Sequence, residues 1–166
     1  MAYPIYLDIE KVGAFTYNEQ LKNWLAQPKI RQRIAALRVT ETVIYTAVWA
    51  CKRDALNAFE QDTCEAAANE RAAFEAFVLE KGKALQGFGL FEALDQYYSR
   101  PGQVGWQSWP SEFHQPDGEA VEKFARSHER EIRFYMWLQW LCAEQLQEVN
   151  QAAAEYGVKP VSYTHL

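Results

Sequence analysis

The stretch that indicates the fold most clearly is residues 134–149, which read FYMWLQWLCAEQLQEV. Its apolar side chains recur every three or four residues, the spacing that places side chains on one face of an α-helix. That face carries Phe134, Leu138, Leu141, Gln145 and Val149, and Trp137 widens it. The pattern predicts one long helix from about residue 129 to residue 156.

The same helical spacing extends over most of the chain. We expect further helices over residues 18–25, 42–59, 65–79 and 85–98, with another from residue 119. In the second of these, one apolar face carries Ile44, Val48, Cys51, Ala55 and Phe59. Ile30, Ile34 and Leu37 continue the helical spacing after Pro28, and Gly82 interrupts it between two helices.

Two stretches do not follow the helical pattern. Residues 4–9 are short, β-branched and bounded by proline, so they predict either a strand or an extended lead-in. Residues 99–118 are rich in proline and glycine, yet they contain Trp106, Trp109 and Phe113, so we expect an ordered loop pinned by these rings. No strand-period alternation occurs elsewhere in the sequence, and the predicted chain is mainly α.

Composition excludes several classes of protein. The chain has 166 residues, enough for one modest domain, and its net charge of −5 disfavours a phosphate-binding, nucleic-acid partner. It lacks an apolar run long enough to cross a membrane and the basic, apolar start of a signal peptide. The three cysteines, Cys51, Cys64 and Cys142, are widely spaced and predict reduced thiols in a cytoplasmic protein.

Aromatic residues make up 14% of the chain. They favour a core built from large side chains, and the alternative is a platform on which sugar rings stack. No catalytic motif accompanies them: His128-Glu129 begins like a zinc-protease helix, but Ile132 stands where its second histidine is needed. Cys51 and Cys142 lie on apolar helix faces and predict buried, inert thiols. We therefore expect no metal, no cofactor and no catalytic residue in this chain.

Several stretches carry distinctive residue orders. They are Pro4–Glu10 (PIYLDIE), Val43–Lys52 (VIYTAVWACK), the Phe-rich residues 74–94, Trp106–Pro110 (WQSWP) and Phe134–Leu141 (FYMWLQWL) with Glu144-Gln145. Together, and in this order, they resemble the amylomaltases, the 4-alpha-glucanotransferases of glycoside hydrolase family 77. Tyr3 stands where that family usually has Asn, and Ile44 stands where it usually has Asp.

The resemblance implies a fold and a reaction. It implies that residues 1–160 are a fragment of a (β/α)8 barrel, with a helical inserted subdomain over about 17–128 and a barrel helix over about 129–156. It also implies transfer of α-1,4-glucan segments between maltodextrins, including maltose, by a retaining mechanism. The carboxylates of that reaction lie beyond this chain in the family, so the fragment alone is expected to be inactive. Residues 161–166 look like a translated sequencing-adaptor junction, and we expect them to be a non-native tail.

The resemblance leaves one candidate contact with substrate. Trp49 occupies a position where the family often has an aromatic residue that meets a glucan outside the catalytic cleft. Because Trp49 lies about 100° from the Ile44–Val48–Cys51 face, it is either a core residue or a partly exposed stacking residue. Gln139 and Gln145 are expected to be structural, each bonding a separate partner.

A barrel helix without its barrel is expected to leave its apolar stripe uncovered. That stripe consists of Phe134, Trp137, Leu138, Leu141 and Val149, and its exposure would favour dye binding and aggregation. The alternatives to the fragment hypothesis are a free-standing helical protein-interaction module and a carbohydrate-binding module without catalysis. The gene sequence beyond Pro160 would separate these three hypotheses.

Overall fold

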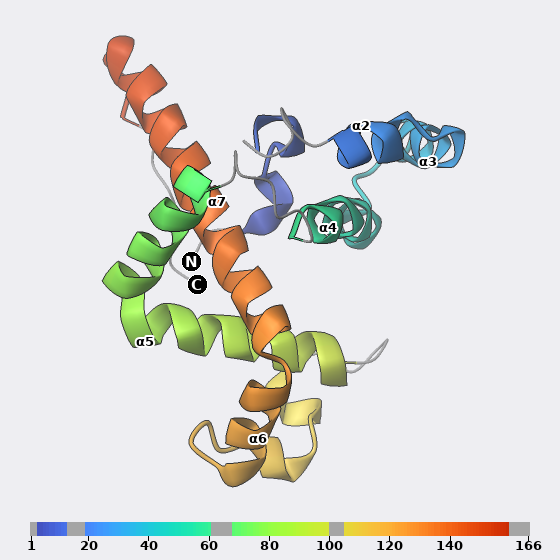
Figure 1. Ribbon diagram of the computed structural model, residues 1–166. Helices are drawn as coiled ribbons and strands as arrows, with labels where there is room; N and C mark the ends of the chain where they lie inside the picture. Colours follow the sequence, from blue (N-terminus) through green and yellow to red (C-terminus); the bar gives the residue numbers. More distant parts are fainter. Residues whose placement is uncertain (1–2, 13–18, 61–67, 100–104, 160–166) are drawn as a thin grey trace. The chain divides into compact units, whose positions relative to one another are not determined.

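The computed structural model describes residues 3–12, 19–60, 68–99 and 105–159. Over these residues the secondary structure is helical and contains no strand, which confirms the prediction of a mainly α chain. The α-helices are α2 (Glu19–Ala26), α3 (Pro28–Arg38), α4 (Tyr45–Glu60), α5 (Ala68–Tyr98), α6 (Glu119–Ser127) and α7 (Glu129–Glu155) (Figure 1). The short 3₁₀ turns are η1 (Pro4–Tyr6), η2 (Ile9–Lys11), η4 (Trp106–Ser108) and η5 (Ser111–Phe113). No helix among the described residues is both long and apolar enough to span a bilayer.

The predicted strand or extended lead-in over residues 4–9 is wrong, because the chain forms two successive 3₁₀ turns there. Pro4 begins η1, where its fixed φ suits the first helical position. The Leu7 N–H donates to the Pro4 carbonyl at 3.1 Å, and the Val12 N–H donates to the Ile9 carbonyl at 3.2 Å. The Asp8 carboxylate accepts from the Glu10 N–H at 3.1 Å and so caps η2.

The predicted helices over 18–25 and 42–59 are present with shifted ends. Helix α4 begins at Tyr45, three residues later than expected, and Ile44 precedes it. Ile44 is consequently 46% exposed and does not belong to the buried face on which we placed it. Cys51, Ala55 and Leu56 form the buried part of that helix, whereas the side chain of Phe59 lies outside the described residues.

The predicted interruption at Gly82 is confirmed. Its φ of 53° and ψ of −135° are not helical, and they lie in a region that favours glycine because a Cβ atom would be crowded there. Figure 1 shows α5 bending as a result. The first residues expected in this helical pair, 65–67, lie outside the described residues, as does the expected tail at 161–166.

The chain divides into two compact units. Unit 1 comprises Met1–Ala73 and Leu141–Leu166, and unit 2 comprises Phe74–Trp140. In unit 1, α2, α3 and α4 pack on one another, and the turns η1 and η2 pack on α4 (Figure 1). The buried apolar side chains of unit 1 include Ile5, Leu7, Val12, Ile30, Cys51, Ala55, Leu56, Leu141 and Cys142.

Unit 2 is held together by aromatic rings. The rings of Phe124 and His128 stack with centroids 3.9 Å apart, and the Tyr98 ring lies 4.6 Å from that of Phe113. Trp109 is buried and packs on Phe91 with centroids 5.2 Å apart. For residues 105–118, the described part of the connection, this confirms that the rings of Trp109 and Phe113 hold the loop. Trp106 differs from this expectation because it is 45% exposed.

The prediction that the apolar stripe of α7 lies uncovered is wrong for most of the stripe. Phe134, Leu138 and Leu141 are buried, and only Val149 is largely exposed, at 56%. On another face of α7, inside unit 2, α5 approaches α7 closely at Gly89. A Cβ atom on Gly89 would lie 2.7 Å from the Ile132 carbonyl oxygen, so the absence of a side chain permits this packing.

Candidate functional site

The segment Tyr3–Val12 presents two different faces. Ile5, Leu7 and Val12 are buried, with exposed fractions of 7%, 2% and 1%. Tyr3 and Tyr6 are 71% and 78% exposed. The segment thus buries aliphatic side chains and leaves two tyrosine rings at the surface.

Lys52 of α4 ties this segment to the helix bundle of unit 1. Its Nζ donates to the carbonyl oxygens of Ile5 and Leu7, each at 2.7 Å. Burial lowers the pKa of the Lys52 ammonium, while the nearby Asp8 carboxylate acts in the opposite direction. The ammonium therefore satisfies two main-chain acceptors of this segment.

Gln145 of α7 forms hydrogen bonds to the same segment at Asp8, the residue after Leu7. The Asp8 N–H donates to Oε1 of Gln145 at 2.8 Å, and Nε2 of Gln145 donates to the Asp8 carbonyl at 2.8 Å. One side-chain amide therefore satisfies both main-chain groups of Asp8, as a neighbouring strand would. Gln145 is expected to bond a partner of its own, and the structure shows that this partner is the main chain of Asp8. Gln139, the second glutamine expected to be structural, is buried, with 4% of its surface exposed.

A hollow of about 560 Å³ opens in unit 1 beside the clamped segment. Its lining is formed by residues 6–10 of the segment, with Trp24, Leu25, Ile34, Leu37, Arg38, Val43, Val48, Cys51, Lys52 and Ala55. A second hollow of about 500 Å³ shares Glu10, Leu25, Ile34 and Arg38 with the first and extends along α3 to Val39. We call the two together the unit 1 groove. Sequence reasoning missed it, because its walls come from four separate segments.

Trp49 follows a lining residue of this groove in the sequence but does not line the groove itself. Its neighbour Val48 is a lining residue, as are Cys51 and Lys52 on the same side of α4. Trp49 is partly exposed, which agrees with a position at the margin of the core. Its contact with a glucan stays a prediction.

The described cysteines are not candidates for nucleophilic catalysis. Cys51 and Cys142 are both buried, which confirms the expectation from their helix faces, and Cys64 lies outside the described residues. Burial raises the pKa of the Cys142 thiol to about 11, so it remains protonated near neutral pH. Within the described ranges, no group of three or more His, Cys, Asp and Glu side chains is arranged to hold a metal ion.

Glu92 of α5 is a partly buried carboxyl group in unit 2. Burial raises its pKa, and the neighbouring Asp95 carboxylate acts in the same direction. Asp95 accepts a hydrogen bond from the Ser99 hydroxyl at 2.6 Å, near the end of the same helix. Neither carboxyl group lines one of the hollows described here. These two carboxyl groups therefore do not belong to any of the hollows described here.

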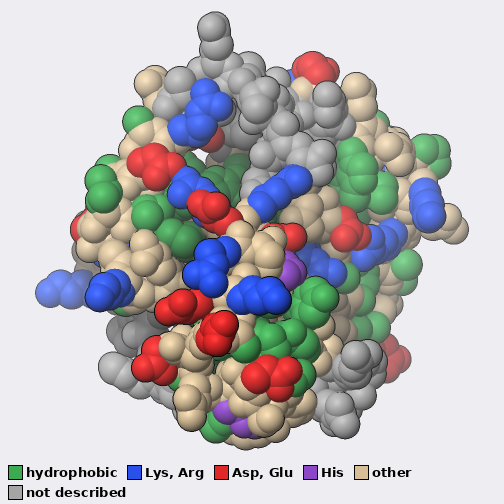
Figure 2. Space-filling view, turned by 60° about the horizontal axis from the view of Figure 1, so that its bottom comes forward, with side chains coloured by type: hydrophobic (Ala, Val, Ile, Leu, Met, Phe, Trp, Pro, Cys, Tyr) green, Lys and Arg blue, Asp and Glu red, His purple; other side chains and the backbone are tan. Residues whose placement is uncertain are grey.

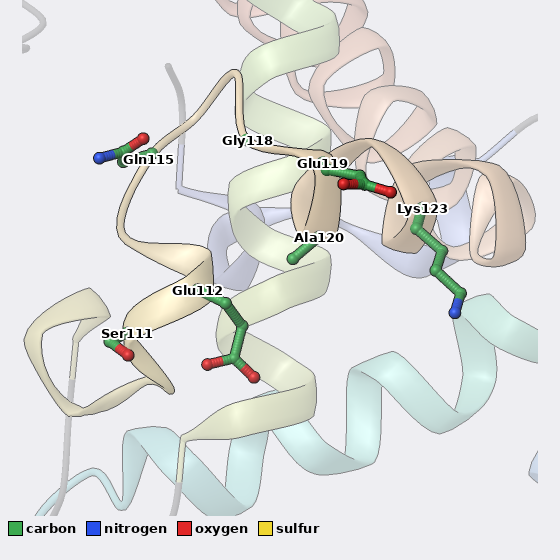
Figure 3. A pocket seen from close by; sticks show the side chains of 7 residues that line it. All are labelled: Ser111, Glu112, Gln115, Gly118, Glu119, Ala120 and Lys123. Carbon is green, nitrogen blue, oxygen red and sulfur yellow. The ribbon is translucent and has the colours of Figure 1, made fainter.

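Unit 2 has an open hollow of about 590 Å³ between η5 and the start of α6. Its polar lining residues are Ser111, Glu112, Gln115, Glu119 and Lys123. Figure 3 shows that these side chains project in different directions, with Gln115 pointing away from the others. Groups that act on one substrate atom must converge, so this arrangement does not form an acid–base pair.

The surface shows no single region of positive charge on the face seen in Figure 2. Lys and Arg side chains lie there among Asp and Glu side chains, with apolar patches between them. Elsewhere in the described residues, Arg33 and Asp54 of unit 1 form an ion pair 2.7 Å apart. Arg133 pairs with Glu75 in unit 2 in the same way. Charges of both signs on one surface suit an uncharged ligand better than a polyanion.

Comparison with known proteins gives the family. The sequence profile of glycoside hydrolase family 77, described as 4-alpha-glucanotransferase, matches residues 1–161. The chain belongs to this family. A match over nearly the whole chain also argues against a free-standing interaction module.

Three curated relatives show how much of a family 77 protein is present. The chain is 29% identical over 164 residues to the 4-alpha-glucanotransferase of Haemophilus influenzae, and the match covers 93% of the chain and 24% of the relative. It is 28% identical to the 4-alpha-glucanotransferase of Mycobacterium tuberculosis, with 93% of the chain and 20% of the relative covered. The corresponding enzyme of Thermus thermophilus is 25% identical over 122 residues, or 74% of the chain and 23% of the relative. The chain thus spans a fifth to a quarter of the length of these relatives.

Proposed function

We propose that this chain is part of a 4-alpha-glucanotransferase that transfers α-1,4-glucan segments between maltodextrins. The observation that carries the proposal is the family 77 match over residues 1–161, together with three relatives that bear this name. The substrates would be maltose and longer maltodextrins, and the enzyme would act in the cytoplasm.

The reaction would follow a retaining mechanism with a covalent intermediate. One carboxylate attacks the anomeric carbon while a second carboxylic acid protonates the leaving oxygen, and an acceptor sugar then takes the place of water. We place neither carboxylate on this chain. Its residues would instead form the helical insertion, over about 17–128, and one helix of a (β/α)8 barrel, α7.

Trp49 is proposed as a contact for the glucan outside the catalytic cleft. Its partial exposure on α4 supports this role, because a stacking ring must be accessible on one face while its base is held by the core. Trp49→Ala in the complete enzyme should weaken handling of long maltodextrins more than that of short ones. Trp106→Ala, which removes a tryptophan that is 45% exposed on η4, is the matched control.

The complete protein encoded by the gene provides the direct test of the transfer reaction. Incubation with maltotriose should yield glucose together with maltodextrins longer than the substrate, separated by chromatography. Products of hydrolysis alone, or no products from a folded protein, would contradict the proposal.

A further inference from the structure

Unit 1 is assembled from two stretches that lie far apart in the sequence. Its residues are Met1–Ala73 and Leu141–Leu166, and the whole of unit 2, Phe74–Trp140, lies between them in the chain. Unit 2 is thus inserted into the sequence of unit 1. An inserted segment with its own core can keep its fold while the unit around it opens. Contacts between the two stretches of unit 1 therefore decide whether that unit stays closed.

Each unit has apolar contacts of its own. In unit 2 the Phe124 ring packs on rings of the same inserted segment, among them those of Phe113 and His128. In unit 1, α4 packs on α2 and α3 and buries Ala55 and Leu56. Helices α5 and α7 run through both units, but the hydrogen bonds of a helix are local. Either helix can therefore shorten at the boundary of a unit without losing the rest of its turns.

Gln145 joins the two stretches of unit 1. Its side-chain amide accepts from the Asp8 N–H and donates to the Asp8 carbonyl, both at 2.8 Å. On the turn of α7 before it, Leu141 and Cys142 are buried, whereas Val149, one turn later, is 56% exposed. Gln145 thus lies near the point where the buried part of α7 ends, and it binds the first stretch there.

The hydrogen bonds from Lys52 do not join the two stretches. Lys52 donates to the carbonyls of Ile5 and Leu7, and all three residues belong to Met1–Ala73. Loss of the Gln145 amide would leave these two hydrogen bonds in place and remove those between the Tyr3–Val12 segment and α7. Asp8 and Gln145 are 137 residues apart, so their pairing also carries a loop-closure entropy cost that contacts within one stretch avoid.

We propose that the Asp8–Gln145 pair is a latch that stabilises unit 1 alone, and that the two units unfold independently. While the latch is closed, it holds the end of α7 against the Tyr3–Val12 segment. When it is lost, α2, α3 and α4 unfold together more often, and the ring cluster around Phe124 keeps its fold. This inference does not depend on the reaction that the complete protein catalyses.

Amide hydrogen exchange of the 166-residue chain, followed by mass spectrometry of peptides from each unit, tests the latch. Gln145→Ala should speed exchange in α2, α3 and α4 about ten-fold, because two hydrogen bonds are lost. Exchange in α6 should stay at the rate of the unmodified chain. Gln147→Ala is the matched control, since Gln147 is exposed on the same helix and its substitution changes helix propensity equally.

Phe124→Ala provides the reverse test. It should speed exchange in α6, where a buried ring is lost, and leave exchange in α2, α3 and α4 unchanged. Equal acceleration of both units in either variant would overturn the proposal, because the chain would then unfold as one body. A Gln145→Ala chain that fails to fold throughout would be such a result. Exchange in Gln145→Ala no faster than in Gln147→Ala would show that the Asp8–Gln145 pair is not a latch.

Discussion

The two units use their aromatic residues in different ways. In unit 2, Trp109, Phe124 and Trp140 are each 6% exposed, and rings pack on rings. In unit 1, Tyr3, Tyr6 and Tyr45 are all more than half exposed, and the segment that carries the first two is held by polar side chains. A high aromatic content therefore indicates neither a core nor a platform by itself, because this chain contains both.

Buried and exposed rings are expected to contribute to different properties of the protein, folding stability and ligand binding. Buried rings in unit 2 contribute through the apolar area they remove from water. Exposed rings in unit 1 contribute little to folding and remain accessible for contacts with a ligand. Substitutions of the buried rings in unit 2 should therefore act mainly on the free energy of unfolding, and substitutions of the exposed tyrosines of unit 1 should change it little.

Removal of the Phe124 ring, which contacts several other rings of unit 2, should cause the largest loss in the free energy of unfolding. Phe124 is buried and lies against the rings of Tyr97, Tyr98, Phe113 and His128. Phe124→Ala should lower the free energy of unfolding by about 3–5 kcal/mol, because it leaves a cavity among rings that cannot collapse freely. Urea denaturation followed by circular dichroism measures the change.

Leu79→Ala is the control for Phe124→Ala. Leu79 lies on α5 in the same unit and is 83% exposed, so its truncation should change the free energy of unfolding by less than about 0.5 kcal/mol. Similar losses in the two variants would mean that the ring cluster of unit 2 is not a core.

Substitution of Lys52, which holds the Tyr3–Val12 segment, should cause the second largest loss in the free energy of unfolding. Lys52→Met keeps much of the aliphatic stem but leaves the carbonyl oxygens of Ile5 and Leu7 without their donor. We expect the free energy of unfolding to fall by about 2–4 kcal/mol, since hydrogen bonds to a charged group contribute more than neutral ones. Lys29→Met removes the same charge from an exposed position of α3 and should cost less than about 0.5 kcal/mol. A loss in Lys52→Met no larger than that of the control would show that the two hydrogen bonds from Lys52 do not stabilise unit 1.

The helices were predictable from sequence because their signal is local. The repeat of Phe134, Leu138 and Leu141 indicated α7, and the lack of a Cβ atom on Gly82 indicated the break in α5. The error over residues 4–9 has a local cause as well: the β-branched residues there favour a strand, but Pro4 and the Asp8 cap favour turns.

The groove and the hydrogen bonds that hold its wall were not predictable in the same way. The main chain of Asp8 meets Gln145 across 137 residues of sequence, and the carbonyl of Ile5 meets Lys52 across 47. Periodicity reports which face of one helix is apolar and carries no information about such partners. The resemblance to family 77 marked Lys52 and Gln145 as part of distinctive stretches, yet the contacts of both side chains required the structure.

A side chain added at Gly89, where α5 packs closely on α7, should cause the third largest loss in the free energy of unfolding. A Cβ atom on Gly89 would lie 2.7 Å from the Ile132 carbonyl oxygen and 2.9 Å from Cγ of Met136. Gly89→Ala should therefore lower the free energy of unfolding by about 1–2 kcal/mol, because overpacking exceeds the gain in helix propensity. Two residues earlier on the same helix, a Cβ atom on Gly87 would meet nothing within 4 Å. Gly87→Ala should raise the free energy of unfolding by up to about 1 kcal/mol, and the same sign in both variants would contradict the close approach of α5 to α7.

The smallest effect concerns charge at the surface of unit 1. Arg33 of α3 and Asp54 of α4 approach to 2.7 Å, but their side chains are 37% and 45% exposed. The contact with Asp54 raises the pKa of Arg33 further, yet solvent screens a pair this exposed, and such pairs usually contribute less than about 1 kcal/mol. Asp54→Asn should therefore lower the free energy of unfolding by about 0.5 kcal/mol in dilute buffer.

The amide oxygen introduced by Asp54→Asn could still accept a hydrogen bond from Arg33. Measuring the free energy of unfolding in high salt separates the contribution of the ion pair from that of such a hydrogen bond. The Debye length falls to about 3 Å in 1 M salt, so most of the difference between Asp54→Asn and the unmodified chain should disappear there. Glu41→Gln removes one negative charge from an exposed site between α3 and α4, and it corrects for the change in net charge. An effect of Asp54→Asn that persists unchanged in 1 M salt would identify a packing or hydrogen-bonding role for Asp54. The contact between α3 and α4, on which the shape of the groove depends, would then rest on Asp54 more than the exposure of its ion pair implies.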